Sequence, residues 1–137
     1  MFIRKCTAVA LALGLSTASW AQLVVVVNPS NNNSLDPKTI QRIFLGKEKK
    51  FPDGSETLAV NQVAENDIRQ SFDESLLGRS SSQVSAYWSK LVFTGKGIPP
   101  KEVSSDAEVL ALVAKNPSVI GYIDASSVTA DVKVIDL

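Results

Sequence analysis

Histidine is absent from this chain of 137 residues, and cysteine occurs once, at Cys6. Without an imidazole, no serine or cysteine can be activated as a nucleophile by a histidine of the same chain. Zinc sites that rely on histidine or thiolate ligands are excluded after residue 21, because no cysteine follows Cys6. Without cysteine, residues 22–137 cannot form disulfides, so this part of the chain must be stabilised by its hydrophobic core.

Other catalytic patterns are missing as well. The segment Gly95-Lys96-Gly97 has neither the spacing nor the preceding strand of a phosphate-cradling loop. The acidic residues are scattered, and neighbours such as Asp73 and Glu74 point to different sides of a helix, so they cannot work as a catalytic pair. We therefore expect no enzyme activity, no metal and no cofactor.

The charges balance, with 14 basic and 14 acidic residues in the whole chain. A nucleic-acid-binding surface would need an excess of lysine and arginine, so we expect no nucleic-acid partner. The cluster of Lys47, Lys49 and Lys50 can be interpreted as a docking surface or as a solvated turn. So short a run in a turn favours the solvated turn.

The N-terminus has the pattern of a secretory signal peptide. Arg4 and Lys5 precede an apolar run over 7–15 that is too short for a permanent transmembrane helix. Ser19-Trp20-Ala21 then places small residues at the positions that a signal peptidase reads, which predicts cleavage before Gln22. The alternatives are a buried N-terminal helix and a retained anchor. We expect a cleaved signal peptide over 1–21, a mature domain over 22–137 and a periplasmic location without stable membrane insertion.

The first part of the mature chain shows one strand and one helix. The β-branched run 23–27 is typical of a strand buried on both faces of a sheet. The polar segment 28–34 contains too many turn-forming residues for regular structure and is predicted to be a loop. Asp36 as N-cap, Pro37 at the first helical position and Gly46 as the stop predict a short amphipathic helix.

A second strand and a second helix follow. The segment 57–61 has the pattern of a short strand. Asn66 is a candidate N-cap, and Gly78 a candidate stop, for a helix between them. The apolar residues of this helix recur every four positions, at Ile68, Phe72 and Leu76.

The third helix begins with a capping box formed by Ser80 and Gln83. Its apolar stripe consists of Val84, Tyr87, Trp88 and Leu91. The two aromatic residues of this stripe can stack on a ligand or pack in the core, and their helical spacing favours the core. The segment 94–100 is rich in glycine and proline and predicts irregular structure.

Ser105 and Glu108 form another capping box before a fourth helix, which Asn116-Pro117 ends. The segments 119–123 and 132–135 are predicted to be the last two strands. The resulting order is β-α-β-α-α-α-β-β, which predicts a single α/β domain with a mixed sheet flanked by helices.

The junction between the second strand and the second helix is the candidate binding site. Free N–H groups at the start of a helix attract anions, and amide side chains can add further donors. The candidate ligand-binding residues are Asn61, Gln62, Asn66 and Arg69.

Several segments resemble a known family of exported proteins. Val26-Val27-Asn28-Pro29, Leu35, Ile43-Phe44-Leu45-Gly46-Lys47 and Ile120-Gly121-Tyr122-Ile123 resemble the second lobe of the phosphate-specific periplasmic solute-binding proteins. A group of short, single-lobe substrate-binding proteins of phosphate ABC transporters is similar over Gln70–Gly78, Tyr87-Trp88, Phe93–Gly97 and Pro99-Pro100. The resemblance implies one lobe of a type II periplasmic binding protein-like fold.

The resemblance also implies phosphate as the ligand, but one segment of this chain differs from the pattern of the two-lobed receptors. In the two-lobed receptors, the second lobe contributes an arginine at a strand end and then a Ser-Gly-Thr turn. The corresponding segment here, 61–67, contains neither of them, and Glu65 and Asp67 would repel an anion. Arg69, one turn into the helix, is expected to compensate in part.

Two functions follow from these observations. The first is a periplasmic solute-binding module that binds phosphate or another small anion weakly, with a second chain or another protein completing the one-lobed site. The second is an interaction or regulatory module that has lost solute binding and contacts a protein partner.

Overall fold

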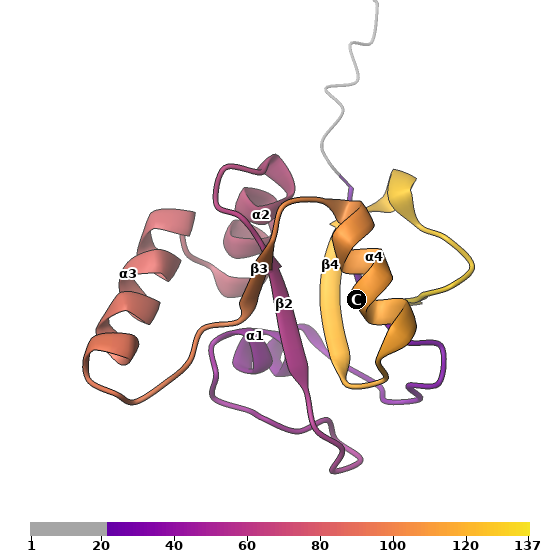
Figure 1. Cartoon of the computed structure of the whole chain (residues 1–137), viewed down its shortest axis with the longest axis horizontal. Helices are drawn as coiled ribbons and strands as arrows, with labels where there is room; N and C mark the ends of the chain where they lie inside the picture. The colour runs from indigo at the N-terminus through magenta and orange to yellow at the C-terminus, as the bar shows by residue number, and fades with distance from the viewer. Residues whose placement is uncertain (1–21) are drawn as a thin grey trace, which may run out of the picture.

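The computed structural model describes residues 22–137, and the segment 1–21, with the expected signal peptide and cleavage site, lies outside the described residues. Figure 1 shows the elements in chain order: β1 (Leu23–Val27), α1 (Pro37–Phe44), β2 (Leu58–Gln62), α2 (Asp67–Phe72), the π-helical turn η1 (Asp73–Leu77), α3 (Ser81–Phe93), β3 (Lys101–Val103), α4 (Asp106–Lys115), β4 (Val119–Asp124), the 3-10 turn η2 (Ala125–Ser127) and β5 (Lys133–Ile135). Among the described helices, none is long and apolar enough to cross a lipid bilayer.

The five strands form one mixed sheet in the order β3-β2-β4-β1-β5. The central β4 runs parallel to β2 and antiparallel to β1, with Val27 opposite Ile120. The strands β2 and β3 are also parallel, so the C-terminal ends of β2, β3 and β4 lie at the same edge of the sheet. The expected mixed sheet flanked by helices is confirmed.

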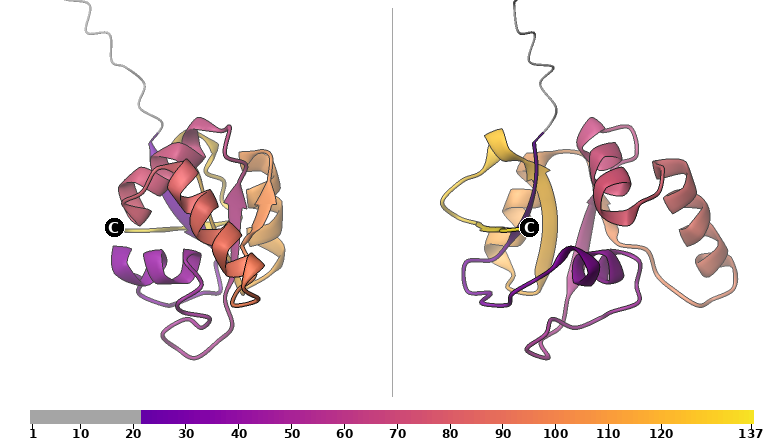
Figure 2. Two further views of the ribbon diagram at one scale, coloured as in Figure 1. Left: turned by 90° about the vertical axis from the view of Figure 1, so that its left-hand side faces the viewer. Right: turned by 180° about the vertical axis from the view of Figure 1, so that it is seen from behind.

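Helices cover both faces of this sheet. The near face in Figure 1 carries α4, and the far face, seen from behind in Figure 2, carries α1 and α2. Two buried clusters correspond to the two faces: Val25 and Val27 of β1 contribute to the α1–α2 side, and Val26 contributes to the α4 side. The prediction of a strand buried on both faces is therefore confirmed for Val25, Val26 and Val27, whereas Leu23 and Val24 are half-buried.

The predicted helix starts are confirmed where the side chains form the caps. Asp36 accepts a hydrogen bond from the Thr39 N–H at 2.7 Å, and both halves of the box between Ser80 and Gln83 are formed. The second expected box is only half formed. The Ser105 hydroxyl caps α4, but the Glu108 carboxylate accepts from the Ser104 N–H instead of the Ser105 N–H.

Two local features differ from the sequence prediction. The short strand β3 was missing from the predicted order, because Lys101 and Glu102 are polar and exposed at the edge of the sheet. The helix after Asn66 changes to π-helical geometry at η1, and the wider turn shifts its apolar face by one residue. As a result Leu77 is buried, whereas Leu76, the third residue of the predicted four-residue repeat, is only half-buried.

Gly121 in the central strand permits the close approach of α4. A Cβ atom at this position would lie 2.6 Å from Cγ1 of Val109. We expect Gly121→Ala to lower the free energy of unfolding by about 1–3 kcal/mol, because α4 would have to move away from the sheet. Urea unfolding measures this loss. Val109→Ala, which removes the opposing methyl groups, is expected to make the added methyl less destabilising, and equal losses in both backgrounds would contradict this packing.

Candidate functional site

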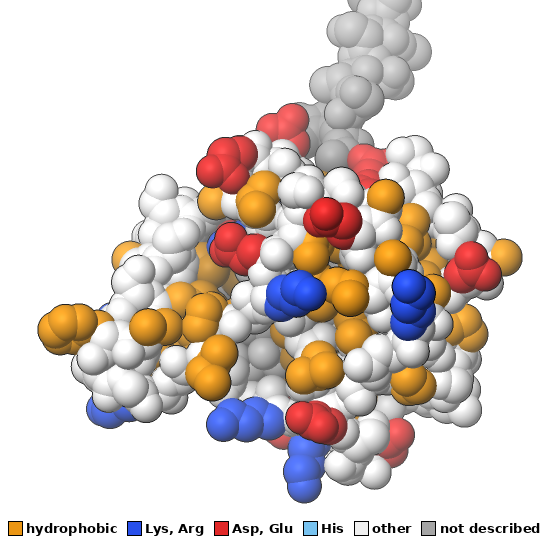
Figure 3. Space-filling model, viewed as in Figure 1, with side chains coloured by type: hydrophobic (Ala, Val, Ile, Leu, Met, Phe, Trp, Pro, Cys, Tyr) orange, Lys and Arg blue, Asp and Glu red, His pale blue; other side chains and the backbone are white. Residues whose placement is uncertain are grey.

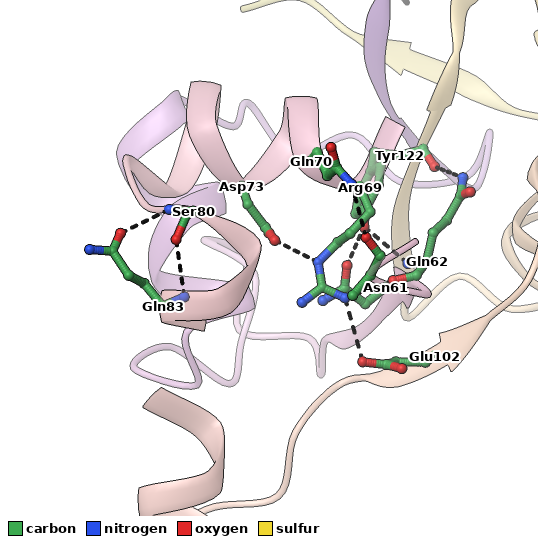
Figure 4. A network of polar contacts seen from close by, with 10 residues as sticks. Asn61, Gln62, Arg69, Gln70, Asp73, Ser80, Gln83, Glu102 and Tyr122 are labelled. Atoms are coloured by element: carbon green, nitrogen blue, oxygen red, sulfur yellow. Dashed lines mark hydrogen bonds and ion pairs between the residues drawn. The ribbon is translucent and has the colours of Figure 1, made fainter. Parts of the chain in front are cut away.

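The C-terminal end of β2 brings the four predicted site residues together. Asn61 and Gln62 are the last residues of the strand, and both are buried. Asn66 stands just before α2, and Arg69 lies in the first turn of that helix. Figure 4 shows Asn61, Gln62 and Arg69 in one network of polar contacts that extends to β3 and β4.

Arg69 is almost completely buried, with 2% of its surface exposed. Its Nε donates to Oδ2 of Asp73 at 2.7 Å, and its Nη1 donates to the Gln62 carbonyl at 2.7 Å. Nη1 also lies 3.4 Å from the Glu102 carboxylate. The guanidinium therefore lies against β2 and β3 and is engaged by two carboxylates.

The amide side chains of Gln62 and Asn66 are used within the fold. Nε2 of Gln62 donates to the Asp106 carboxylate at 2.7 Å and to the Tyr122 carbonyl at 3.2 Å. Nδ2 of Asn66 donates to Gln62 Oε1 and to the Ser104 carbonyl, each at 2.9 Å. These bonds connect the ends of β2, β3 and β4.

Asn66 occupies the N-cap position of α2, but its side chain accepts no hydrogen bond from the helix, so the side-chain cap predicted from the sequence is not formed. Within residues 22–137, the N–H groups of Asp67 and Ile68 donate to no other backbone or side-chain group. Glu65 and Asp67, both exposed, carry the nearest charges in the sequence. The start of α2 thus combines free donors with an unfavourable charge for anions.

Tyr122 of β4 is not among the site residues predicted from the sequence, although its hydroxyl group bonds to two of them. Its hydroxyl accepts from the Gln62 N–H at 3.0 Å and donates to Oδ1 of Asn61. The ring stacks on Phe72 with 4.0 Å between the centroids. Burial raises the pKa of Tyr122 well above its ordinary value. A tyrosine in a buried strand offers no sequence signal for such a role.

A pocket of about 490 Å³ lies between α3 and the β2–β3 edge. Asn61 and Arg69 line it on one side, Glu102 lies on β3, and Phe93 lies on α3. A second pocket, of about 510 Å³, is more apolar and is lined by residues that include Leu58 and Ile98. Figure 3 shows hydrophobic side chains gathered on this face of the molecule between α3 and the strands.

Among residues 22–137, no three acidic side chains gather in a group that can hold a metal ion. The arrangement of buried amides, one arginine and free helix N–H groups instead suits binding through hydrogen bonds.

The Tyr122 hydroxyl leads to a prediction on stability and pH. The pKa of Tyr122 is raised in the folded state, so above about pH 10 the unfolded chain loses this proton first and stability falls. We expect Tyr122→Phe to lower the free energy of unfolding by about 1–3 kcal/mol at neutral pH, because the buried Gln62 N–H loses its acceptor.

Urea unfolding between neutral and alkaline pH tests both parts of this prediction. The variant should lose less stability above about pH 10 than the original chain does. Tyr87→Phe is the matched control, because the Tyr87 hydroxyl is only half-buried and donates to the Leu45 carbonyl. An alkaline fall of the same size in Tyr122→Phe and in the original chain would contradict the assignment.

Comparison by sequence identifies no relative: no protein-family model and no curated protein matches the chain. Comparison of structures does find matches. An ABC-type phosphate transport receptor from Vibrio cholerae is 25% identical, with a TM-score of 0.65, over 84% of this chain and 45% of the receptor. PstS from Borrelia burgdorferi matches with 14% identity and a TM-score of 0.62, over 84% of this chain and 46% of its own length.

A protein from Clostridium perfringens, assigned as a phosphate ABC transporter substrate-binding protein and solved with bound phosphate, has a TM-score of 0.67. It is 17% identical, over 84% of this chain and 44% of that protein. The chain thus spans less than half the length of the receptors it matches. Its described part has the periplasmic binding protein-like fold found in one portion of the phosphate ABC transporter substrate-binding proteins.

Proposed function

We propose that this chain is an exported solute-binding module of the phosphate-receptor type, which binds phosphate or another small oxyanion weakly in the periplasm. The observation that carries the proposal is the structural match over 84% of the chain to phosphate receptors, including one solved with phosphate. The absence of histidine and of a mature cysteine agrees with a binding role rather than catalysis.

The β2–α2 junction is the part of the fold that suits an oxyanion best. The N–H groups of Asp67 and Ile68 are free, and they lie at the positive end of α2. Asn61, Gln62, Asn66 and Arg69 surround this junction from the strand side and the helix side. We assign to them the role of shaping the site and of holding the backbone donors in place.

Two features make the binding weak. Glu65 and Asp67 place negative charge beside the free N–H groups, and charge repulsion opposes the approach of an anion. The charge of Arg69, the nearest cation on α2, is balanced by Asp73 and Glu102. A site without a free cation lacks the charge-assisted hydrogen bonds that give oxyanion sites their strength.

Isothermal titration of residues 22–137 with phosphate tests this function. We expect saturable heat in the millimolar range, and sulfate should show whether the site distinguishes between oxyanions. Replacing both junction charges, by Glu65→Gln with Asp67→Asn, should raise the affinity about fivefold, because two exposed repulsive charges are removed.

The control is a double variant, Glu48→Gln with Asp131→Asn, which removes the same charge far from the junction in the sequence. This control should leave the affinity nearly unchanged. Absence of heat at millimolar phosphate in every variant would contradict oxyanion binding. Equal gains in the two double variants would show a general charge effect and would contradict the assigned position.

A second candidate function is an interaction or regulatory module that binds a protein partner instead of a solute. It is favoured by the exposure of two large apolar side chains, with Phe93 exposed by 92% and Ile98 by 89%. Such side chains, next to apolar pockets, often mark contact surfaces. A module that is monomeric and free of partners when recovered from the periplasm would contradict this alternative.

A further inference from the structure

We propose that the pocket between α3 and the β2–β3 edge, called here the α3 pocket, binds a free α-amino acid with an apolar side chain. Its lining includes Asn61, Arg69 and Glu102 from the sheet side and Ser89, Val92 and Phe93 from α3. This inference goes beyond the proposed oxyanion binding, because it concerns a ligand of different charge in a pocket that shares only Asn61 and Arg69 with the residues assigned to the β2–α2 junction.

The polar part of the α3 pocket is rich in hydrogen-bond donors without partners. Nη2 of Arg69 and Nδ2 of Asn61 have no hydrogen-bond partner within residues 22–137, although these side chains are only 2% and 3% exposed. Such donors call for a ligand group with several acceptors, and a carboxylate offers two oxygens to two donors.

The charges around the α3 pocket restrict the ligand further. Arg69 is already balanced by Asp73, whose Oδ2 lies 2.7 Å from Nε. Glu102, 54% exposed and 3.4 Å from Nη1, adds a second negative charge at the rim. A dianion is therefore opposed, whereas a carboxylate that carries its own ammonium group can bind Arg69 with one end and Glu102 with the other.

Apart from two serines of α3, the rest of the lining is apolar and suits a hydrocarbon side chain. It consists of Val92 and Phe93 of α3 and of Pro99 and Pro100 before β3, and Phe93 is almost fully exposed. A volume of about 490 Å³ lies within the range of small-molecule sites. An apolar side chain in this space would remove its own surface and part of the Phe93 surface from water, which favours binding. Figure 3 shows hydrophobic side chains on this face.

The fluorescence of Trp88, which lines the α3 pocket, can report leucine binding. The chain has two tryptophans, and Trp88 is the one that lies within residues 22–137. We expect titration of residues 22–137 with L-leucine to change the fluorescence of Trp88 in a saturable way and to give matching heat by calorimetry. Isovalerate, which lacks the ammonium group, and isopentylamine, which lacks the carboxylate, should each bind at least about fivefold more weakly.

Two variants locate the leucine site. Glu102→Gln keeps the side-chain shape at an exposed position and should weaken leucine binding about fivefold, because the partner of the ammonium group is lost. Isovalerate, which has no ammonium group, should bind more tightly to this variant, because a negative charge beside its carboxylate is removed. Ser89→Phe fills the α3 pocket from the helix and should abolish the response. Ser82→Phe is its matched control, since Ser82 is also exposed on α3 but lines a different pocket.

Three results would overturn the inference: no saturable change at millimolar L-leucine, an unchanged response in Ser89→Phe, or equal losses in Ser89→Phe and Ser82→Phe. The leucine test and the phosphate test can fail independently of each other. Phosphate heat that responds to Glu65→Gln with Asp67→Asn and persists in Ser89→Phe belongs to the β2–α2 junction. Failure of leucine binding beside intact phosphate binding would thus overturn the α3-pocket inference alone.

Discussion

The buried ion pair between Arg69 and Asp73 is the constraint on which the candidate sites depend. Both side chains lie in the interior, with 2% and 0% exposure, and a charge left there without its partner is strongly destabilising. The pair joins α2 to the π-helical turn η1, and the bond from Nη1 to the Gln62 carbonyl fixes both to the end of β2. The position of the guanidinium is therefore set by the core rather than by a ligand.

The ion pair with Asp73 determines which of the two candidate sites the Arg69 guanidinium can contribute to. With Nε and Nη1 engaged, only Nη2 of Arg69 has no partner within residues 22–137, and the arginine lines the pocket beside α3. The start of α2 keeps only backbone donors. The Arg69 charge would strengthen an oxyanion site at the start of α2, but here it pairs with Asp73 in the interior and lines the pocket beside α3. Glu65 and Asp67 add negative charge at the start of α2, which makes that site still less favourable for an anion.

The aromatic interior supports the polar network. Phe44 and Phe72 pack edge to face with 4.6 Å between their centroids, and Tyr122 stacks on Phe72. This stack holds the tyrosine hydroxyl against Asn61 and the Gln62 N–H, so the end of β2 is fixed by β4 as well as by α2. Phosphate receptors share this fold over less than half of their length. In this chain, most of the polar side chains at that edge of the sheet are used for internal bonds.

The sequence by itself determined the strands 23–27 and 119–123, the helices capped by Asp36 and Ser80, and the absence of histidine-based chemistry. These features depend on local periodicity, on capping side chains and on composition. Only the tertiary structure decided the short edge strand at Lys101, the shift of the buried position from Leu76 to Leu77, and the partners of Arg69. The physical reason is that these features depend on contacts between separate elements: β3 pairs with β2, η1 packs against α1, and Arg69 reaches the Gln62 carbonyl and Glu102. Contacts between residues so far apart in the chain leave no periodic pattern in the sequence.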